Sequence, residues 1–234
     1  MQHYIFFDLD GTLSDTHALA RATWLEILRP YGVDVDIDVY RKSIHARDRD
    51  DIFQDLVPSL DAEARQRLSQ LERDQYYRRL RSTGPLPSLR NFISEAREAG
   101  FCLVLVTNSP RYDAEISLDP LGLDDIFSET VFSDDPDVAA MKPDPCPYRV
   151  ALSRLGIEPH QVIAFEDSCE GMTAATAAGI STIGLVTTES PANLRDAGAC
   201  LLVGDYSDNA LDDLLKDPSS LTSCSHSQAT GLEL

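Results

Sequence analysis

Short apolar runs recur along the chain, and longer stretches with helical spacing of their hydrophobic residues separate them. The runs are apolar at successive positions instead of alternating with polar residues. This pattern is typical of strands in a parallel sheet that helices cover on both faces. The runs occupy residues 4–7, 101–106, 130–132, 162–165, 182–186 and 200–203. We therefore predict a β-strand at each of these segments.

Three stretches between the predicted strands are each followed by a glycine, as helices often are. Residues 88–99 are followed by Gly100, residues 147–155 by Gly156, and residues 171–178 by Gly179. Glycine is the residue expected just past a helix C-terminus, because it adopts the left-handed conformation there without steric cost. Strands and helices in alternation predict an α/β fold, a doubly wound, Rossmann-like parallel sheet.

One long segment interrupts this alternation. From residue 15 to residue 83 no strand-like run occurs, and hydrophobic residues such as Trp24, Ile27, Leu28 and Tyr31 fall at helical spacing. We therefore predict an all-helical cap at 15–83, inserted into an α/β core formed by residues 1–14 and 84–216. The Ser- and Thr-rich residues 217–234 have few large apolar side chains, and we predict a flexible tail there.

Composition limits the partners and the compartment. The 234 residues carry a net charge of −19, which argues against nucleic acid as a partner. The five cysteines are widely spaced and form no Cys-x-x-Cys pair, so we expect a reducing cytosol and a cytoplasmic protein. The chain begins without a basic and then apolar leader, and no apolar stretch approaches the roughly 20 residues of a membrane span. We expect no membrane partner.

Two carboxylates stand at the end of the first predicted strand. Asp8 and Asp10 are separated by one residue, and Gly11 follows at once, in the sequence Asp-Leu-Asp-Gly-Thr-Leu. Side chains two residues apart on a strand point to the same side. Carboxylates this close repel unless a cation or a shared proton relieves them, so the pair indicates a cation site or an acid/base site. Taken alone, an Asp-x-Asp-Gly stretch is as readily explained by a turn.

Three further groups of polar residues follow later predicted strands. Thr107 and Asn108 follow the second strand, Lys142 lies among prolines, and Glu166 and Asp167 follow the strand at 162–165. Each has a structural alternative: a Ser/Thr turn, a solvated lysine, and acids that cap a helix. Together they have a common explanation, because a doubly wound sheet brings its strand ends to one edge. Oxygen ligands from acids, without a Cys/His cluster, suit Mg²⁺.

These residues, in this order and with this strand context, resemble the four motifs of the haloacid dehalogenase superfamily. The motifs are Asp-Leu-Asp-Gly-Thr-Leu, the hydrophobic strand that ends in Thr107-Asn108, Lys142-Pro143, and Glu166-Asp167-Ser168 with Gly171 downstream. The resemblance extends over about residues 4–203. The helical insertion is similar to the cap of subfamily I, which includes phosphoglycolate phosphatases, sugar-phosphate phosphatases and β-phosphoglucomutase.

The resemblance implies a role for each residue. Asp8 would attack phosphorus and become an aspartyl phosphate, and Asp10 would act as general acid and base. Asp8, the Asp10 carbonyl, Glu166 and Asp167 would hold Mg²⁺. The phosphoryl group would be bound by Thr107, Asn108 and Lys142. The implied function is hydrolysis of a phosphate monoester of a small metabolite, such as a sugar, polyol, glycolate or nucleotide phosphate, by a monomer or a homodimer.

The predicted cap offers candidates for substrate specificity in a basic stretch. These candidates are Lys42, His45, Arg47 and Arg49. Relatives have a glycine-containing loop in this region, whereas this chain has no glycine there, so which arginine replaces the relatives' basic residue stays open. A solvated face balanced by the acids at 48, 50 and 51 explains the stretch equally well.

Two other functions stay open. A phosphomutase of the β-phosphoglucomutase type would use the same residues but return the phosphoryl group to a sugar. A phospho-acceptor signalling domain also combines an aspartate, a hydroxyl, a lysine and an acid pair. Its acceptor lies on a later strand and it needs no cap, so the order of the strands counts against it.

Overall fold

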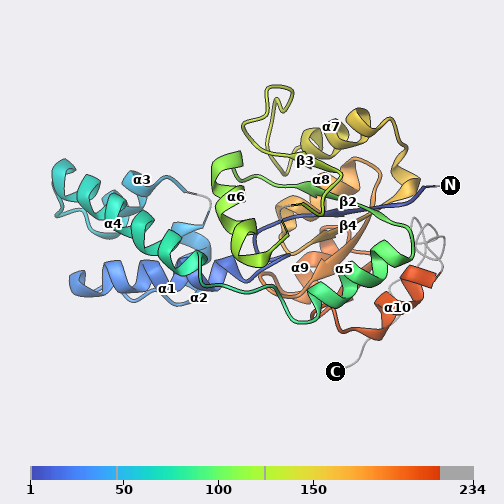
Figure 1. Ribbon diagram of the computed structural model, residues 1–234. Helices are drawn as coiled ribbons and strands as arrows, with labels where there is room; N and C mark the ends of the chain where they lie inside the picture. Colours follow the sequence, from blue (N-terminus) through green and yellow to red (C-terminus); the bar gives the residue numbers. More distant parts are fainter. Residues whose placement is uncertain (1, 46, 124, 217–234) are drawn as a thin grey trace. The chain divides into compact units, whose positions relative to one another are not determined.

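The computed structural model describes residues 2–45, 47–123 and 125–216, and the predicted tail at 217–234 lies outside these residues. The chain divides into two compact units. One consists of the N-terminal segment up to Asp15 together with the chain from Gly84 onward, and the other consists of Thr16–Thr83. We describe each unit by itself (Figure 1).

The first unit is built on a parallel sheet with the strand order β3-β2-β1-β4-β5-β6. The strands are β1 (Tyr4–Phe7), β2 (Cys102–Val106), β3 (Glu129–Val131), β4 (Val162–Glu166), β5 (Ser181–Leu185) and β6 (Leu201–Val203). Each predicted strand therefore agrees with an observed strand to within one residue at either end. The predicted doubly wound α/β fold is confirmed.

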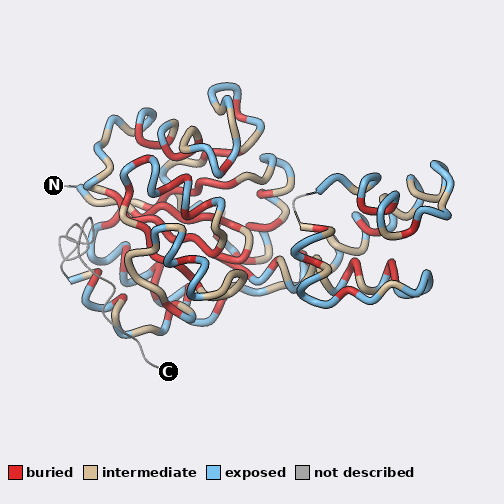
Figure 2. Tube along the Cα trace, turned by 180° about the vertical axis from the view of Figure 1, so that it is seen from behind, coloured by how far each residue is buried: buried red, intermediate tan, exposed pale blue. Residues whose placement is uncertain are grey.

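Helices cover both faces of this sheet (Figure 1). They are α5 (Leu89–Glu98), α6 (Arg111–Leu118), α7 (Cys146–Leu155), α8 (Cys169–Ala177), α9 (Pro191–Asp196) and α10 (Asn209–Lys216). Successive side chains of β1 serve opposite faces: Ile5 and Phe7 pack with residues of α5, α6 and α10, whereas Phe6 packs with residues of α7 and α8. This two-sided burial explains why the strands read as continuous apolar runs, and Figure 2 shows buried residues along them.

The central place of β1 matters for function. β1 pairs with β2 on one side and with β4 on the other, so the sheet order reverses direction at this strand. In open α/β sheets, ligands bind beyond the carboxyl ends of the strands at such a switch point. The residue that immediately follows β1 is Asp8.

The second unit contains helices joined by short loops, and its described residues form no strand. It contains α1 (Thr16–Leu28), α2 (Ile37–Val39), α3 (Arg49–Leu56) and α4 (Ala62–Leu80), with a π-helical turn at Tyr40–Ile44 between α2 and α3. Its own core includes Trp24, Phe53 and Ile52, and the rings of Trp24 and Phe53 lie 5.2 Å apart. Its role as a cap over the active site stays a prediction.

Short 3₁₀ turns complete the described structure at Arg29–Tyr31, Asp119–Leu121 and Pro159–Gln161. Within the described ranges, no helix combines the length and the apolar composition that crossing a bilayer requires.

Candidate active site

The strand ends bring the predicted residues of the first unit to one edge of the sheet. Asp8 follows β1, Thr107 follows β2, and Glu166 is the last residue of β4. The parallel register extends past the strands, because the Asp8 amide donates to the Phe165 carbonyl at 3.1 Å. The side chains therefore start from neighbouring backbone positions although the sequence separates them by up to 158 residues.

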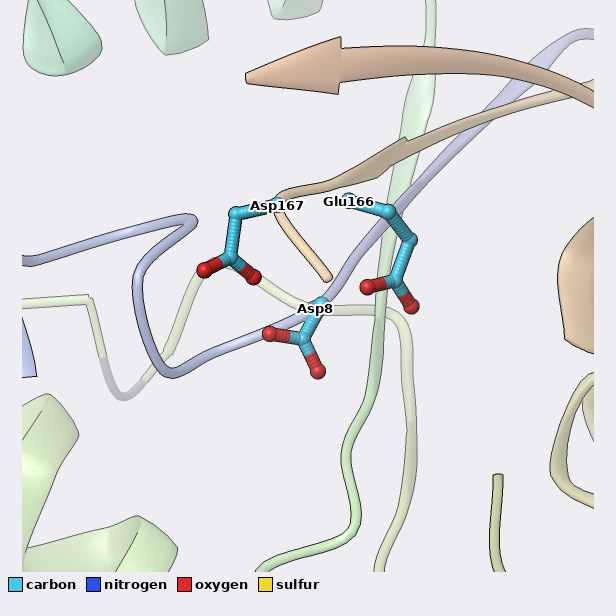
Figure 3. A group of neighbouring side chains, drawn as sticks. All are labelled: Asp8, Glu166 and Asp167. Carbon is cyan, nitrogen blue, oxygen red and sulfur yellow. The ribbon is translucent and has the colours of Figure 1, made fainter. Parts of the chain in front are cut away.

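Three carboxylates form a buried cluster at this edge. Oxygen atoms of Asp8, Glu166 and Asp167 all lie within 4.8 Å of one another. Figure 3 shows the three side chains converging, Asp8 from the end of β1 and the other two from the end of β4. Asp8 is 8% exposed, Glu166 is 0% exposed and Asp167 is 1% exposed. Carboxylates so close together and so deeply buried need a compensating cation or a shared proton.

Lys142 supplies part of that compensation. Its Nζ donates to Oδ1 of Asp8 at 2.7 Å, to Oε1 of Glu166 at 2.6 Å and to the carbonyl of Val106 at 2.7 Å. All three ammonium protons are thus used, and the side chain is only 3% exposed. One ammonium thus joins the ends of β1, β2 and β4. The sequence indicated that these strand ends meet at one edge, but it did not indicate these hydrogen bonds.

The Asn108 side chain lies against the backbone of Lys142. Its amide nitrogen donates to the Lys142 carbonyl at 3.1 Å, and its amide oxygen accepts from the Lys142 N–H at 2.9 Å. This pair of hydrogen bonds holds the backbone from which the lysine side chain extends. In the structure, the Asn108 side chain thus positions Lys142, and phosphate binding by Asn108 stays a prediction.

Asp10 does not belong to the carboxylate cluster. Its Oδ2 accepts a hydrogen bond of 2.7 Å from the hydroxyl of Ser109, beyond the end of β2. Metal binding through the Asp10 carbonyl stays a prediction. Thr107 is buried, and its Oγ1 accepts from the Ser109 N–H at 3.0 Å.

Tyr148 is a member of the site that the sequence analysis missed. It lies on α7, is fully buried, and donates its hydroxyl proton to Oε1 of Glu166. Its ring lies under the ammonium of Lys142, with 5.2 Å between Nζ and the ring centroid. The sequence pattern predicts Tyr148 as an apolar core position of a helix. Only the packing of α7 against the sheet brings its hydroxyl to Glu166.

The loop after β5 also contributes residues that were missed. The hydroxyl of Thr187 donates to the Gly11 carbonyl at 2.7 Å, and Thr188 Oγ1 would lie 2.8 Å from a Cβ placed on Gly11. A signal for these residues was present, because two threonines directly follow the strand predicted at 182–186. The rule that identified Thr107 would have identified them as well.

Burial dominates the ionisation of the cluster. Loss of hydration raises the pKa of Asp8, Glu166 and Asp167, and the negative charge of Asp8 adds to the effect on the other two. For Lys142, burial opposes the charged form, but the carboxylates of Asp8 and Glu166 outweigh it and raise the pKa of the ammonium. The lysine is therefore charged at neutral pH.

The site fits a further cation. Three carboxylates face one ammonium, and Oε2 of Glu166 is buried without a hydrogen-bond partner. Glycines make room for the acids: a Cβ on Gly171 would lie 1.9 Å from Oε2 of Glu166, and a Cβ on Gly11 would lie 2.0 Å from Oδ2 of Asp167. Gly11 also has a φ of +82°, which a larger residue adopts only with strain. An all-oxygen set of carboxylates suits a hard divalent cation.

The predicted specificity residues all lie in the second unit, and two of them are paired there. Arg47 donates to Asp55 at 2.6 Å, and Arg49 donates to Glu72 at 2.6 Å. The ring of His45 lies 4.8 Å from the ring of His17, and Lys42 is exposed on the π-helical turn. A role of these residues in substrate binding stays a prediction.

We expect Tyr148→Phe to lower the free energy of unfolding by about 1–3 kcal/mol, because it removes a donor from a buried carboxylate. Urea unfolding followed by circular dichroism measures the change. Tyr206→Phe is the matched control. Tyr206 is also buried, but its hydroxyl donates to the neutral carbonyl of Thr12 at 3.0 Å, and we expect a smaller loss. An equal or larger loss in Tyr206→Phe would contradict a charge-assisted bond at Tyr148.

We expect Arg49→Met to destabilise the helical unit. The Glu72 side chain is only 2% exposed, and the substitution removes the guanidinium that pairs with its carboxylate. The loss should be about 1–3 kcal/mol. Trp24 is the only tryptophan of the chain and lies in the core of this unit, so its fluorescence during urea unfolding reports the change. Arg67→Met removes an exposed pair with Glu63 and serves as the control. If the two variants unfold alike, Arg49 does not compensate Glu72.

The parallel α/β sheet carries an aspartate, a lysine and an acid pair at its carboxyl edge, as the family resemblance predicts. A model of the haloacid dehalogenase-like hydrolases matches residues 3–179. The chain therefore belongs to this family, and the predicted family membership is confirmed.

Several relatives are phosphatases. The validoxylamine A 7'-phosphate phosphatase of Streptomyces hygroscopicus subsp. limoneus is 31% identical over 86% of this chain and 93% of its own length. The phosphorylated carbohydrates phosphatase of Thermotoga maritima is 31% identical over 85% of this chain and 93% of its own. A solved structure from Thermotoga maritima, provisionally assigned as a β-phosphoglucomutase, is 27% identical with a TM-score of 0.76, over 92% of this chain and 99% of its own. The prediction of an enzyme, a phosphoric monoester hydrolase, is confirmed.

Proposed function

We propose that the protein is a Mg²⁺-dependent phosphatase that hydrolyses the phosphate monoester of a small metabolite through an aspartyl phosphate on Asp8. One observation carries the proposal: a buried aspartate at the switch point of the sheet is bonded to Lys142 within a cluster of oxygen ligands. The phosphatase activity of two relatives, one of which acts on phosphorylated carbohydrates, supports a sugar phosphate or a similar ester as the substrate.

In the first step, an oxygen of Asp8 attacks phosphorus while the bond between phosphorus and the ester oxygen breaks. Lys142 holds the other oxygen, Oδ1, and so orients the nucleophile. Asp10 gives its proton to the leaving oxygen, so the substrate departs as an alcohol. Thr107 and Lys142 bind oxygens of the transferred group; for this, Lys142 gives up one of its three bonds within the protein, and its charge balances part of the group's negative charge.

In the second step, Asp10 is a carboxylate and accepts a proton from a water molecule, whose oxygen attacks the phosphorus of the aspartyl phosphate. The bond between phosphorus and Asp8 breaks, and inorganic phosphate and the free carboxylate result. A Mg²⁺ ion held by Asp8, the Asp10 carbonyl, Glu166 and Asp167 would supply the positive charge that lets an anionic nucleophile approach an anionic phosphate.

The helical unit is the proposed source of specificity. Lys42, His45, Arg47 and Arg49 would contact the part of the substrate beyond the phosphoryl group. Arg47 and Arg49 are engaged in ion pairs with Asp55 and Glu72, and this favours the exposed Lys42 as a direct contact. The proposed enzyme is cytoplasmic and acts as a monomer or a homodimer.

A panel of phosphorylated metabolites tests the proposal through the phosphate released with Mg²⁺ and with EDTA. We expect release from at least one sugar, polyol, glycolate or nucleotide phosphate, and loss of that release with EDTA. Release that persists undiminished in EDTA would contradict the role of the metal. No release from any ester of the panel, or from p-nitrophenyl phosphate, would contradict the phosphatase.

A phosphomutase is the second candidate, because the structure provisionally assigned as a β-phosphoglucomutase covers nearly the whole chain. The two functions differ in the fate of the phosphoryl group. A phosphatase releases phosphate without an activator, whereas the mutase converts one sugar phosphate into its isomer and requires a bisphosphate. Isomer formation from glucose 1-phosphate that depends on added glucose 1,6-bisphosphate, without net phosphate release, would favour the mutase.

A further inference from the structure

The hydroxyl of Ser109 makes a specific contact with Asp10. Ser109 lies beyond the end of β2, and Asp10 lies beyond the end of β1, 99 positions earlier in the chain. Ser109 Oγ donates to Oδ2 of Asp10 at 2.7 Å, the length of a good hydrogen bond between a hydroxyl and a carboxylate. Both side chains are half-buried, so solvent competes only partly for this bond.

Ser109 is fixed by its backbone on both sides. Its N–H donates to Oγ1 of Thr107 at 3.0 Å, and its carbonyl accepts from the Ser133 N–H at 3.3 Å. Pro110, which restricts the chain further, follows and precedes α6. The serine hydroxyl therefore extends from a rigid base, as a positioning group requires.

The two aspartates of the first motif are thus held by different partners. Lys142 binds Asp8, and its positive charge favours the carboxylate form that acts as a nucleophile. Asp10 is bound by a neutral hydroxyl instead, and its side chain takes no part in the bonds of Lys142. A neutral donor on Oδ2 leaves Oδ1 as the oxygen that can carry and release a proton.

We propose that Ser109 is a positioning residue for Asp10: it holds Oδ2 so that the other oxygen delivers its proton to the leaving group. The proposal rests on the proposed phosphatase function. When Asp10 gives up the proton, the hydroxyl of Ser109 also stabilises the carboxylate that remains, because hydrogen bonds to a charged acceptor are stronger than those to a neutral one. Ser109 itself touches neither the phosphorus nor the leaving oxygen in this role.

This role makes a prediction about leaving groups. Benzyl phosphate releases a strongly basic alkoxide unless the oxygen is protonated as the bond breaks, phenyl phosphate is intermediate, and p-nitrophenyl phosphate releases a stable anion. The three esters have similar shapes, so they differ mainly in their need for a general acid. A general acid contributes about 10²–10⁴-fold to a rate, and a misplaced one loses part of that contribution.

The experiment measures kcat/KM, which reports the first step, with Mg²⁺ for the three esters in wild type, Ser109→Ala and Ser109→Thr. For Ser109→Ala we expect a loss of about tenfold or more with benzyl phosphate and of less than about threefold with p-nitrophenyl phosphate. Ser109→Thr retains a hydroxyl and should recover most of the lost rate. Thermal unfolding of each variant shows whether the fold is intact.

Ser117→Ala is the matched control. Ser117 lies on α6, is 4% exposed, and donates its hydroxyl only to the Asp113 carbonyl of its own helix at 3.0 Å. We expect its rates with all three esters to stay near those of wild type.

Three outcomes would overturn the inference. Equal losses with all three esters would mean that Ser109 has only a structural role. A faster Ser109→Ala enzyme would mean that the serine holds Asp10 in an orientation that hinders proton transfer. Both leave the phosphatase intact. A wild-type enzyme that hydrolyses none of the esters and none of the metabolites would overturn the proposed function, and this inference with it.

Discussion

Replacement of Asp8 by asparagine is expected to reduce turnover by about 10⁴-fold or more, because the amide cannot form the phosphorylated intermediate. The side chain keeps its size, and Lys142 keeps its bonds to Glu166 and to the Val106 carbonyl, so we expect the fold to be retained. Phosphate release from the best substrate of the metabolite panel measures the loss. Circular dichroism and thermal unfolding confirm that the variant is folded.

Asp137→Asn provides the comparison for this substitution. Asp137 accepts hydrogen bonds from Arg154, is about half exposed, and lies outside the carboxylate cluster. The same change of acid to amide should leave the rate there near that of wild type. A folded Asp8→Asn enzyme with activity close to wild type would contradict an aspartyl phosphate on Asp8 and would require another nucleophile.

The second large effect is expected at Lys142. Lys142→Met removes the ammonium that Asp8 and Glu166 share and leaves two buried carboxylates without it. Breaking a buried ion pair in this way costs about 3–5 kcal/mol of stability. Turnover should fall by about 10³-fold or more as well, because the same ammonium orients the nucleophile and balances the phosphoryl group. Urea unfolding and phosphate release measure the two effects separately.

A second substitution separates charge from packing at this site. Adding Glu166→Gln to Lys142→Met removes one of the uncompensated acids, and we expect it to restore part of the lost stability but none of the activity. Lys216→Met is the control for loss of a lysine, because Lys216 is exposed and lies 3.7 Å from the similarly exposed Asp213. A Lys142→Met protein as stable as wild type would mean that protonated acids, and not the ammonium, relieve the cluster.

The fold could be predicted because its signals are local. Each strand is a run of apolar residues, and helices at 89–98, 146–155 and 169–177 begin and end within two residues of the segments that their glycine stops predicted. The parallel arrangement follows as well, since a strand without polar alternation must be covered on both faces. Such features depend on residues close in the chain, where a single sequence is most informative.

The candidate site could be predicted only in part. The position of Asp8, Thr107 and Glu166 follows from the rule that parallel strands end at one edge of the sheet. The order of the motifs made a contact between Lys142 and the acids plausible. The three hydrogen bonds of the Lys142 ammonium depend on the conformation of a loop, which the sequence does not predict. The catalytic roles of these residues stay predictions.

Residues whose function depends on distant packing were missed or assigned differently. Tyr148 reads as a core residue of a helix, and its hydroxyl reaches Glu166 only because α7 packs on the sheet. Phosphate binding by Asn108 stays a prediction, and the contact of its amide with the backbone of Lys142 was not foreseen. For Arg47 and Arg49 the sequence offered substrate contacts or a solvated face balanced by the acids at 48, 50 and 51, whereas Asp55 and Glu72, 8 and 23 positions further along, pair with them.

The residues alone were enough to establish the α/β class, the order of the elements and the edge at which the chemistry would lie, because strand periodicity and helix ends are properties of neighbouring residues. The tertiary structure decided which polar groups meet. Hydrogen bonds and ion pairs form over about 3 Å, and only folding brings Asp8 to Lys142 or Ser109 to Asp10 across separations of 134 and 99 positions. That difference in range explains why the fold was more predictable than the partners of its acids.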